Sequence, residues 1–329
     1  FPIRPFNLTK GWRFKGGSGA RDIYTRFTTG LNGTPMPSFI NTLGPEERWH
    51  LANYIVSLNQ AKGDGSGRTT VLISKRVEGD IPLDPEAFLW KEAVPLQIPL
   101  LGQVIAKPRW QNPSVDLIEL RSVHNEEELA FLLQWDDPTE DTVHREIKVP
   151  IDLEDTYVKV SDLPRKPETF RDSVALQFPV KNSGGLTKPH FFRGDRRNPV
   201  YLLVWMADRQ AVEEANANGP ETAPKRQPRE GQQAKGKGIW KNGRWKVVVV
   251  RPLLTTDKED VQFEKGRLIP MAINVWDGGN GEHGLIMSLS PWYYVTLENP
   301  VSAMAYMLGL IGAAAMGLFL VRIHRRYCP

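Results

Sequence analysis

The chain has 329 residues, 40% of them hydrophobic and 24% charged, which is the composition of a folded globular protein with two or three domains. Its 42 basic and 38 acidic residues leave a net charge of only +4, so composition gives no support to nucleic-acid binding. The single cysteine, Cys328, excludes an intrachain disulfide, a cysteine-ligated zinc or iron–sulfur site, and covalent attachment of haem through Cys-x-x-Cys-His.

The first part of the chain, residues 1–60, is predicted to form a small helical unit. One helix is expected over about residues 18–29, and a second begins at Pro45, where acidic residues suit the first turn. Between them lies the turn-rich loop GLNGTPMPSF at residues 30–39. The stretch at residues 61–68 is rich in Gly and polar residues, and we expect a linker there.

From residue 69 to residue 298 the pattern changes to short strands that are separated by turn signals. Strands without alternating helices predict a β-sandwich, so the expected fold class is mainly β with a small helical N-terminal segment. The polar stretch at residues 213–238 has no apolar period and is expected to be a long surface insertion. The expected strands are VLISKRV, LIELRSVH, ELAFLLQW, VALQFPV, VYLLVW, WKVVVVRPL and WYYVTL.

An uncharged run at residues 301–321 is long enough to cross a hydrocarbon core of about 30 Å. We therefore expect one C-terminal transmembrane helix over residues 299–323, followed by a short tail. Arg322 and the basic residues after it predict a cytoplasmic tail and place residues 1–298 on the periplasmic, extracytoplasmic side of the cytoplasmic membrane. Small residues four apart along the run suit packing against the transmembrane helix of a partner as well as contact with lipid.

Five motifs follow one another in the strand region. They are LAFLLQWDDPTED, FRDSVALQFPV, KPHFFRGDRRNPVYLLVWMAD, GRWKVVVVRPLLT and FEKGRLIPMAINVWDGGNGEHGLIMSLSPWYYVTLE. In this order they resemble the haem-b-binding domain of the ethylbenzene dehydrogenase γ-subunit family, the electron-transfer subunits of type II dimethyl-sulfoxide-reductase-like molybdoenzymes. The resemblance implies a β-sandwich that holds one haem b without covalent attachment, and partner subunits that carry molybdopterin and iron–sulfur clusters.

The loop and second helix within residues 1–60 resemble the C-terminal half of a class I cytochrome c. In that family a Gly-x-x-Gly-Thr-x-Met-Pro loop supplies a methionine ligand to haem iron, and Met36 is the matching residue. The resemblance implies a haem c only together with a Cys-x-x-Cys-His segment, which this sequence lacks. Either that segment is missing or separate, or the domain has lost its haem.

A low-spin haem b needs two axial ligands from His, Met or Lys. The family's usual methionine, two residues before the Asp of a Gly-Asp motif, corresponds here to Arg193, whose protonated guanidinium cannot ligate iron. His190, three residues earlier, is the expected replacement, and the family's second ligand position corresponds to Met287, with His283 as its competitor. A plain loop role for His190 and a core role for Met287 stay open.

Basic residues around the same loop either pair with the haem propionates or form a solvated basic turn. These residues are Lys188, Arg193, Arg196 and Arg197. Trp276 is expected in the wall of the haem site or in the core. Several aspartates lack the spacing of a calcium loop and are expected to be turn and cap residues, namely Asp136, Asp137, Asp141 and Asp277.

No Gly-x-Ser-x-Gly, His-Glu-x-x-His or P-loop motif is present in the sequence. The chain is therefore expected to be an electron carrier and not an enzyme. It would be a membrane-anchored haem subunit of a respiratory complex that passes electrons between a molybdenum/iron–sulfur module and a cytochrome c or a membrane partner. Two alternatives stay open, the haem subunit of a quinol-oxidising bc-type complex and a haem-free structural or docking subunit with the same sandwich.

Overall fold

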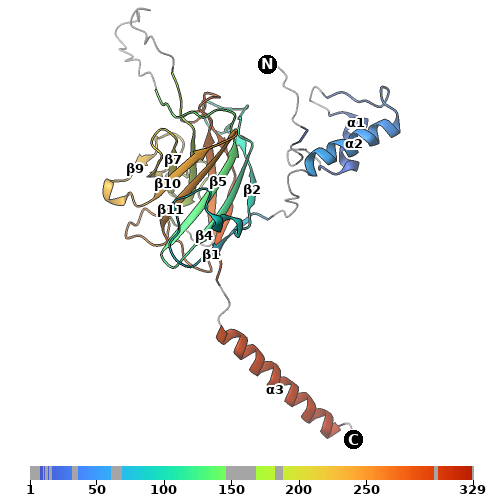
Figure 1. Cartoon of the computed structure of the whole chain (residues 1–329), viewed down its shortest axis with the longest axis vertical. Helices are drawn as coiled ribbons and strands as arrows, with labels where there is room; N and C mark the ends of the chain where they lie inside the picture. Colours follow the sequence, from blue (N-terminus) through green and yellow to red (C-terminus); the bar gives the residue numbers. More distant parts are fainter. Residues whose placement is uncertain are drawn as a thin grey trace, which may run out of the picture.

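The N-terminal unit contains two helices, as the sequence predicts. A computed structural model describes residues 8–9, 11, 14, 17–31, 36–60, 69–145, 168–181, 188–299 and 303–327 of the chain. Helices α1 (Ala20–Thr29) and α2 (Pro45–Gln60) pack against each other (Figure 1). Their contact buries Ile23 of α1 against Ala52 and Ile55 of α2, which are at most 4% exposed.

The strands form one continuous hydrogen-bonded path, β10-β11-β5-β4-β1-β14-β12-β6-β7-β8-β9, with three short strands beside it. Their bounds are β1 Val71–Arg76, β2 Leu96–Pro99, β3 Leu101–Gly102, β4 Leu117–His124, β5 Glu128–Asp136, β6 Ser173–Pro179, β7 Val200–Met206, β8 Ala211–Ala217, β9 Lys225–Arg226, β10 Lys235–Trp240, β11 Arg244–Pro252, β12 Ile269–Trp276, β13 Ser288–Leu289 and β14 Tyr293–Leu297. Two short 3₁₀ helices, η2 (Phe88–Lys91) and η4 (Arg229–Gly231), lie between strands.

This path folds over on itself into a sandwich-like arrangement, so the predicted mainly β class is confirmed (Figure 1). Strand β1 joins the two layers because its first residues pair with β14 and its last two pair with β4. Aromatic rings meet between the layers. The Phe131 and Phe178 ring centroids are 6.0 Å apart, and those of Trp205 and Trp245 are 5.1 Å apart.

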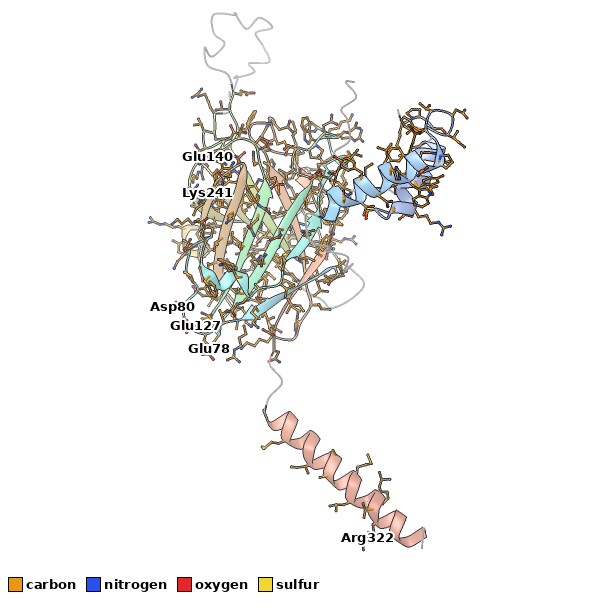
Figure 2. All side chains as sticks on the ribbon, turned by 45° about the vertical axis from the view of Figure 1, so that its right-hand side comes forward. Glu78, Asp80, Glu127, Glu140, Lys241 and Arg322 are labelled. Carbon is orange, nitrogen blue, oxygen red and sulfur yellow. The ribbon has the colours of Figure 1, made fainter. Side chains whose placement is uncertain are left out.

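All seven strands expected from the sequence are present, with ends that agree to within a residue or two. Strand β12 escaped prediction because Pro270 and Asn274 interrupt its apolar run, although seven of its eight residues are buried. The two ends of the sandwich are marked by charged side chains in Figure 2. Glu78, Asp80 and Glu127 lie at one end, and Glu140 and Lys241 lie at the other.

The polar stretch at residues 213–238 differs from the expectation of a surface insertion. It contains most of β8, all of β9 and the first residues of β10. Two of its polar side chains, those of Glu214 and Gln227, are buried, whereas the others are partly or fully exposed. Glu214 is only 1% exposed and accepts hydrogen bonds from the Tyr201 hydroxyl and from the backbone N–H of Ala234. This polar stretch therefore contributes strands to the sheet while most of its polar side chains stay at the surface.

The predicted transmembrane run falls on α3 (Ala303–Tyr327). Side chains at residues 303–306, 308–310 and 323–327, and all of residues 300–302, lie outside the described residues. Within the part of the chain that the structure describes, no helix combines the length and the apolar character needed to cross a membrane.

Candidate functional site

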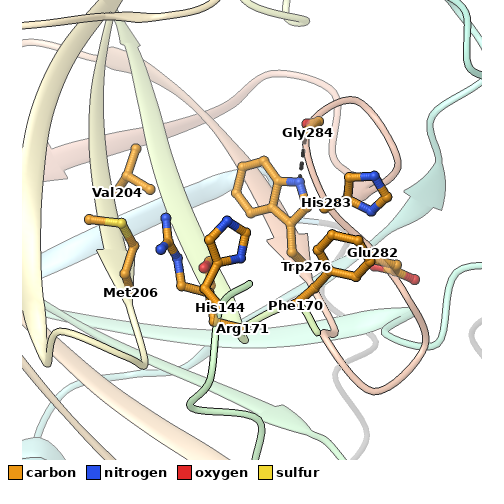
Figure 3. A pocket seen from close by; sticks show the side chains of 10 residues that line it. His144, Phe170, Arg171, Val204, Met206, Trp276, Glu282, His283 and Gly284 are labelled. Carbon is orange, nitrogen blue, oxygen red and sulfur yellow. Dashed lines mark hydrogen bonds between the residues drawn. The ribbon is translucent and has the colours of Figure 1, made fainter. Parts of the chain in front are cut away.

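A pocket of about 160 Å³ opens at one end of the sandwich, where β6 begins and β7 and β12 end (Figure 3). Its lining brings together four kinds of side chain that bind metals, cofactors or anions. There are two imidazoles and a thioether, a guanidinium, and two aromatic rings. These groups belong to His144 and His283, Met206, Arg171, and Phe170 and Trp276.

The turn that follows β12 is held in place by one buried carboxylate. Glu282 is 0% exposed, and its Oε1 accepts hydrogen bonds from the Trp110 indole N–H at 3.0 Å and the Ser114 backbone N–H at 3.1 Å. Gly281 and Gly284 on either side have φ of 74° and 55°, a region that favours glycine. The turn is therefore fixed from inside the protein at the residue next to His283.

His283 is oriented on both sides. Its Nδ1 lies 2.8 Å from the Gly281 carbonyl oxygen, and its ring stacks on Phe170 with centroids 3.8 Å apart and planes 5° apart. The ring of His144 lies 6.1 Å from Phe170 on the same pocket wall. Trp276 donates its indole N–H to the Gly284 carbonyl oxygen at 3.2 Å (Figure 3), so both aromatic walls are tied to this turn.

Three buried aspartates, here named the acid cluster, converge near the same end of the sandwich. Carboxylate oxygens of Asp137, Asp172 and Asp277 lie within 4.8 Å of one another. Burial, followed by repulsion from the other two carboxylates, raises the pKa of Asp137 to about 8. Burial raises the pKa of Asp172 to about 7. Carboxylate oxygens so placed can share protons or hold a hard cation.

The turn role predicted for the aspartates is confirmed for two of them, because Asp137 accepts the Thr139 N–H and Asp277 accepts the Asn280 N–H. The convergence of these two with Asp172 was missed. Asp172 follows an arginine at the start of a strand, and nothing in the local sequence pairs it with residues far away along the chain.

Arg193 lies beside the turn of His283. It is 8% exposed, has a φ of 59°, and donates from Nη2 to the Gly284 carbonyl oxygen at 3.0 Å. Burial lowers the pKa of this guanidinium to about 10. No ion pair of Arg193 occurs among the described residues, whereas Arg171 in the pocket is paired with Asp208 at 2.9 Å.

His190 and Met287, the ligand pair predicted from the sequence, are placed in different surroundings. His190 is exposed, stacks on Phe191 with centroids 4.7 Å apart, and its Nδ1 accepts the Phe192 N–H at 3.2 Å. Met287 is 0% exposed and belongs to an apolar cluster with Phe192. Trp276 packs against this cluster and also lines the pocket, so Met287 lies behind the pocket wall that Trp276 forms.

The other predicted residues are spread over the surface. Lys188 is hydrogen-bonded to the Tyr294 hydroxyl, and its ammonium lies 4.4 Å from the centroid of that ring. Arg196 pairs with Glu221 at 3.2 Å, with its side chain 87% exposed. Arg197 is exposed, and Met36 is half-buried in the N-terminal unit, where its carbonyl oxygen accepts the Leu31 N–H.

Residues 87–217 and 205–288 match the family model described as ethylbenzene dehydrogenase. A protein of Haloferax mediterranei that is named as the heme subunit ORF7 of a respiratory nitrate reductase is 27% identical over 247 residues, which cover 74% of this chain and 80% of that protein. The chlorate reductase subunit gamma of Ideonella dechloratans is 27% identical over 226 residues, covering 66% of this chain and 80% of that subunit.

The solved structures to which this chain is similar include carbohydrate-binding proteins. A family 9 carbohydrate-binding module of Caldicellulosiruptor kristjanssonii in complex with glucose has a TM-score of 0.37 at 8% identity, covering 70% of this chain and 97% of that module. A protein of Bacteroides uniformis described as carbohydrate-binding has a TM-score of 0.39 at 12% identity, covering 70% of this chain and 93% of that one.

Proposed function

This chain belongs to the ethylbenzene dehydrogenase family, and we propose that it is the haem-binding, electron-transfer subunit of a reductase complex. The observation that carries the proposal is the pocket of His144, Met206 and His283 at one end of the domain that matches the family. The names of two relatives, a nitrate reductase heme subunit and a chlorate reductase gamma subunit, support the same function.

The side chains at the pocket fit a haem by their chemistry. Imidazole and thioether are the usual axial ligands of electron-transfer haems, and both line the pocket. The buried guanidinium of Arg193, which donates to the Gly284 carbonyl oxygen and has no ion pair with any residue that the structure describes, suits a propionate carboxylate. A bound haem would supply one-electron exchange between ferric and ferrous iron. The protein's own groups would hold it, orient it and set its charge environment.

We propose that the partners are the catalytic and iron–sulfur subunits of a nitrate- or chlorate-reducing complex, in line with the named relatives. The contact between the Ser74 hydroxyl and His124 Nδ1, at 3.2 Å, is fully buried and out of reach of a substrate, so it does not argue for catalysis by this chain itself. The work of this chain would be to carry electrons toward or away from the catalytic subunit. A haem b held without a covalent bond agrees with the single cysteine, Cys328, which is far along the chain from the pocket residues.

The cellular location stays a prediction that rests on residues 301–326 alone. We propose that residues 1–298 face the periplasm beside the cytoplasmic membrane. Fractionation of cells followed by protease treatment of intact spheroplasts tests this, since the strand domain would be digested without lysis. Protection of the domain until lysis would contradict it.

The decisive experiment for the function is a pyridine haemochrome spectrum of the full chain, purified with haem supplied during expression. We expect the b-type spectrum, with haem that acid acetone extracts completely. A chain that is folded by circular dichroism and binds no haem would overturn the proposal and favour the haem-free docking subunit. Identification of the subunits that co-purify then tests the partners.

A further inference from the structure

Histidines that bind metals show a recurring hydrogen-bond pattern. One ring nitrogen donates its proton to a carbonyl or carboxylate oxygen, and this leaves a lone pair on the other nitrogen for the metal. Which nitrogen carries the proton is inferred from the partners, because a carbonyl oxygen only accepts and a backbone N–H only donates. The described residues of this chain include two histidines whose Nδ1 faces such a one-sided partner, His190 and His283.

The two histidines have opposite tautomers. The Nδ1 of His283 faces the Gly281 carbonyl oxygen at 2.8 Å, so Nδ1 carries the proton and Nε2 has the lone pair. The Nδ1 of His190 accepts the Phe192 N–H at 3.2 Å, so in the neutral ring the proton is on Nε2. His190 would lose that hydrogen bond or its proton before Nε2 could bind a metal, whereas His283 needs no change.

His283 is also held rigidly. Phe170 stacks on one face of the ring, and the neighbouring Glu282 is fully buried and fixed by Trp110 and Ser114. A preset ring direction lowers the entropic cost of forming a metal bond. The ring lines the pocket, while that of His190 lies outside its lining.

We propose that Nε2 of His283 is an axial ligand of the haem iron, and that Glu282 and Phe170 are the residues that position it. The inference rests on the proposed haem binding and deepens it. It assigns the ligand to the residue that the sequence offered only as a competitor. Arg193 donates from Nη2 to the Gly284 carbonyl oxygen of the same turn, and its remaining guanidinium N–H groups would suit a propionate.

The test compares His283→Met with the matched control His190→Met, both in the full chain loaded with haem b. The readouts are the electron paramagnetic resonance and near-infrared magnetic circular dichroism spectra of the ferric protein and its reduction potential. We expect His283→Met to change the ligand signature and raise the potential, because thioether ligation favours the ferrous state. His190→Met should leave both readouts as in the unsubstituted protein.

A second variant guards against a fold defect. His283→Gly should lose the six-coordinate low-spin signature, and added imidazole should restore it, which a misfolded chain could not show. A His283→Gly protein that keeps the low-spin signature without imidazole, or a His283→Met protein with unchanged spectra and potential, would overturn the ligand assignment while haem binding stands. Absence of haem from the unsubstituted chain would instead overturn the proposed function itself.

Discussion

Two buried polar clusters lie in the same sandwich, and the charges of their buried carboxyl groups are neutralised in different ways. The acid cluster is at the pocket end, where three carboxylates face one another. The second, here named the core network, surrounds Tyr201 and Glu214 toward the other end of β7 and contains Arg251 and Asp260. Comparing them shows what each pattern of charge demands of the protein.

The acid cluster has like charges and indole donors. Trp245 donates to Asp172 at 2.9 Å, and Trp135 lies 3.4 Å from Asp137 with its indole N–H. Burial is the main cause that raises the pKa values of Asp137 and Asp172 to about 8 and about 7, and repulsion from the other two carboxylates adds to the rise at Asp137. The indole donors oppose this rise only in part. Here the proton itself is the compensating charge.

The core network contains a cation. Arg251 is 1% exposed, and its Nη2 lies 3.9 Å from Asp260 Oδ2. Its guanidinium carbon lies 5.0 Å from the ring centroid of Tyr201 and 5.1 Å from that of Phe263. Asp260 accepts further hydrogen bonds from the Gln227 amide and the Thr255 hydroxyl. A fixed positive charge thus does for Asp260 what bound protons do for the acid cluster, and the two should respond differently to mutation and to pH.

The largest effect is expected from Arg251→Ala. Removing the cation leaves Asp260 buried without its opposite charge and opens a cavity between two aromatic rings, and loss of one partner of a buried pair costs about 3–5 kcal/mol. Urea unfolding monitored by circular dichroism measures the change. The matched control is Arg267→Ala, whose surface pair with Glu264 is more than half exposed on the arginine side, at 58%. It should cost less than about 1 kcal/mol. Equal effects of the two changes would contradict the comparison.

The sequence predicted the apolar framework well and the core network poorly, for a physical reason. Alternation and β-branched residues identify strands such as β4, β5 and β11, whose burial follows from their own side chains. Strand β8, with its run of Glu213, Glu214 and Asn216, has the composition of a surface segment. Glu214 can be buried only because tertiary partners such as Tyr201 form hydrogen bonds with it. These partners are too far away along the chain for a local sequence pattern to reveal them.

The site shows the same division. The resemblance to a known family singled out Arg193, Trp276 and His283, and the structure brings all three to one turn. The anchor of that turn, Glu282, was missed because an acidic residue between two glycines is typical of exposed loops. Met206 and His144 were not singled out from the sequence, since their shared pocket depends on how distant strand ends meet.

The second prediction concerns pH. Asp137 and Asp172 hold protons in the folded state up to about pH 8 and about pH 7, while their ordinary value is 3.8. Between about pH 4 and pH 8 the folded state therefore binds more protons than the unfolded state. This contribution to stability is complete below about pH 4 and is lost progressively as the pH rises to about 7 for Asp172 and about 8 for Asp137. Asp137→Asn stays neutral, so its free energy of unfolding relative to the unsubstituted chain should improve from pH 5 to pH 8 by roughly 3–4 kcal/mol.

Asp136→Asn is the matched control for that experiment, because Asp136 is the exposed neighbour in sequence and pairs with Arg244 at 3.8 Å on the surface. The difference in free energy of unfolding between Asp136→Asn and the unsubstituted chain should not vary over the same pH range. If the free-energy difference for Asp137→Asn were also independent of pH, the acid cluster would not hold its protons, and the contrast with the core network would disappear.

The smallest effect is expected from Tyr201→Phe. Burial raises the pKa of the Tyr201 phenol above its usual value, so the hydroxyl remains a donor to Glu214 between pH 6 and pH 8. Its removal leaves the carboxylate with the backbone N–H groups of Gln233 and Ala234, so the cost should be about 1 kcal/mol. Unfolding in urea at pH 6 and pH 8 measures it, and the cost should be the same at both. A cost that grew with pH would mean that Glu214, like the acid cluster, relies on a bound proton, and that Arg251 does not compensate the whole network.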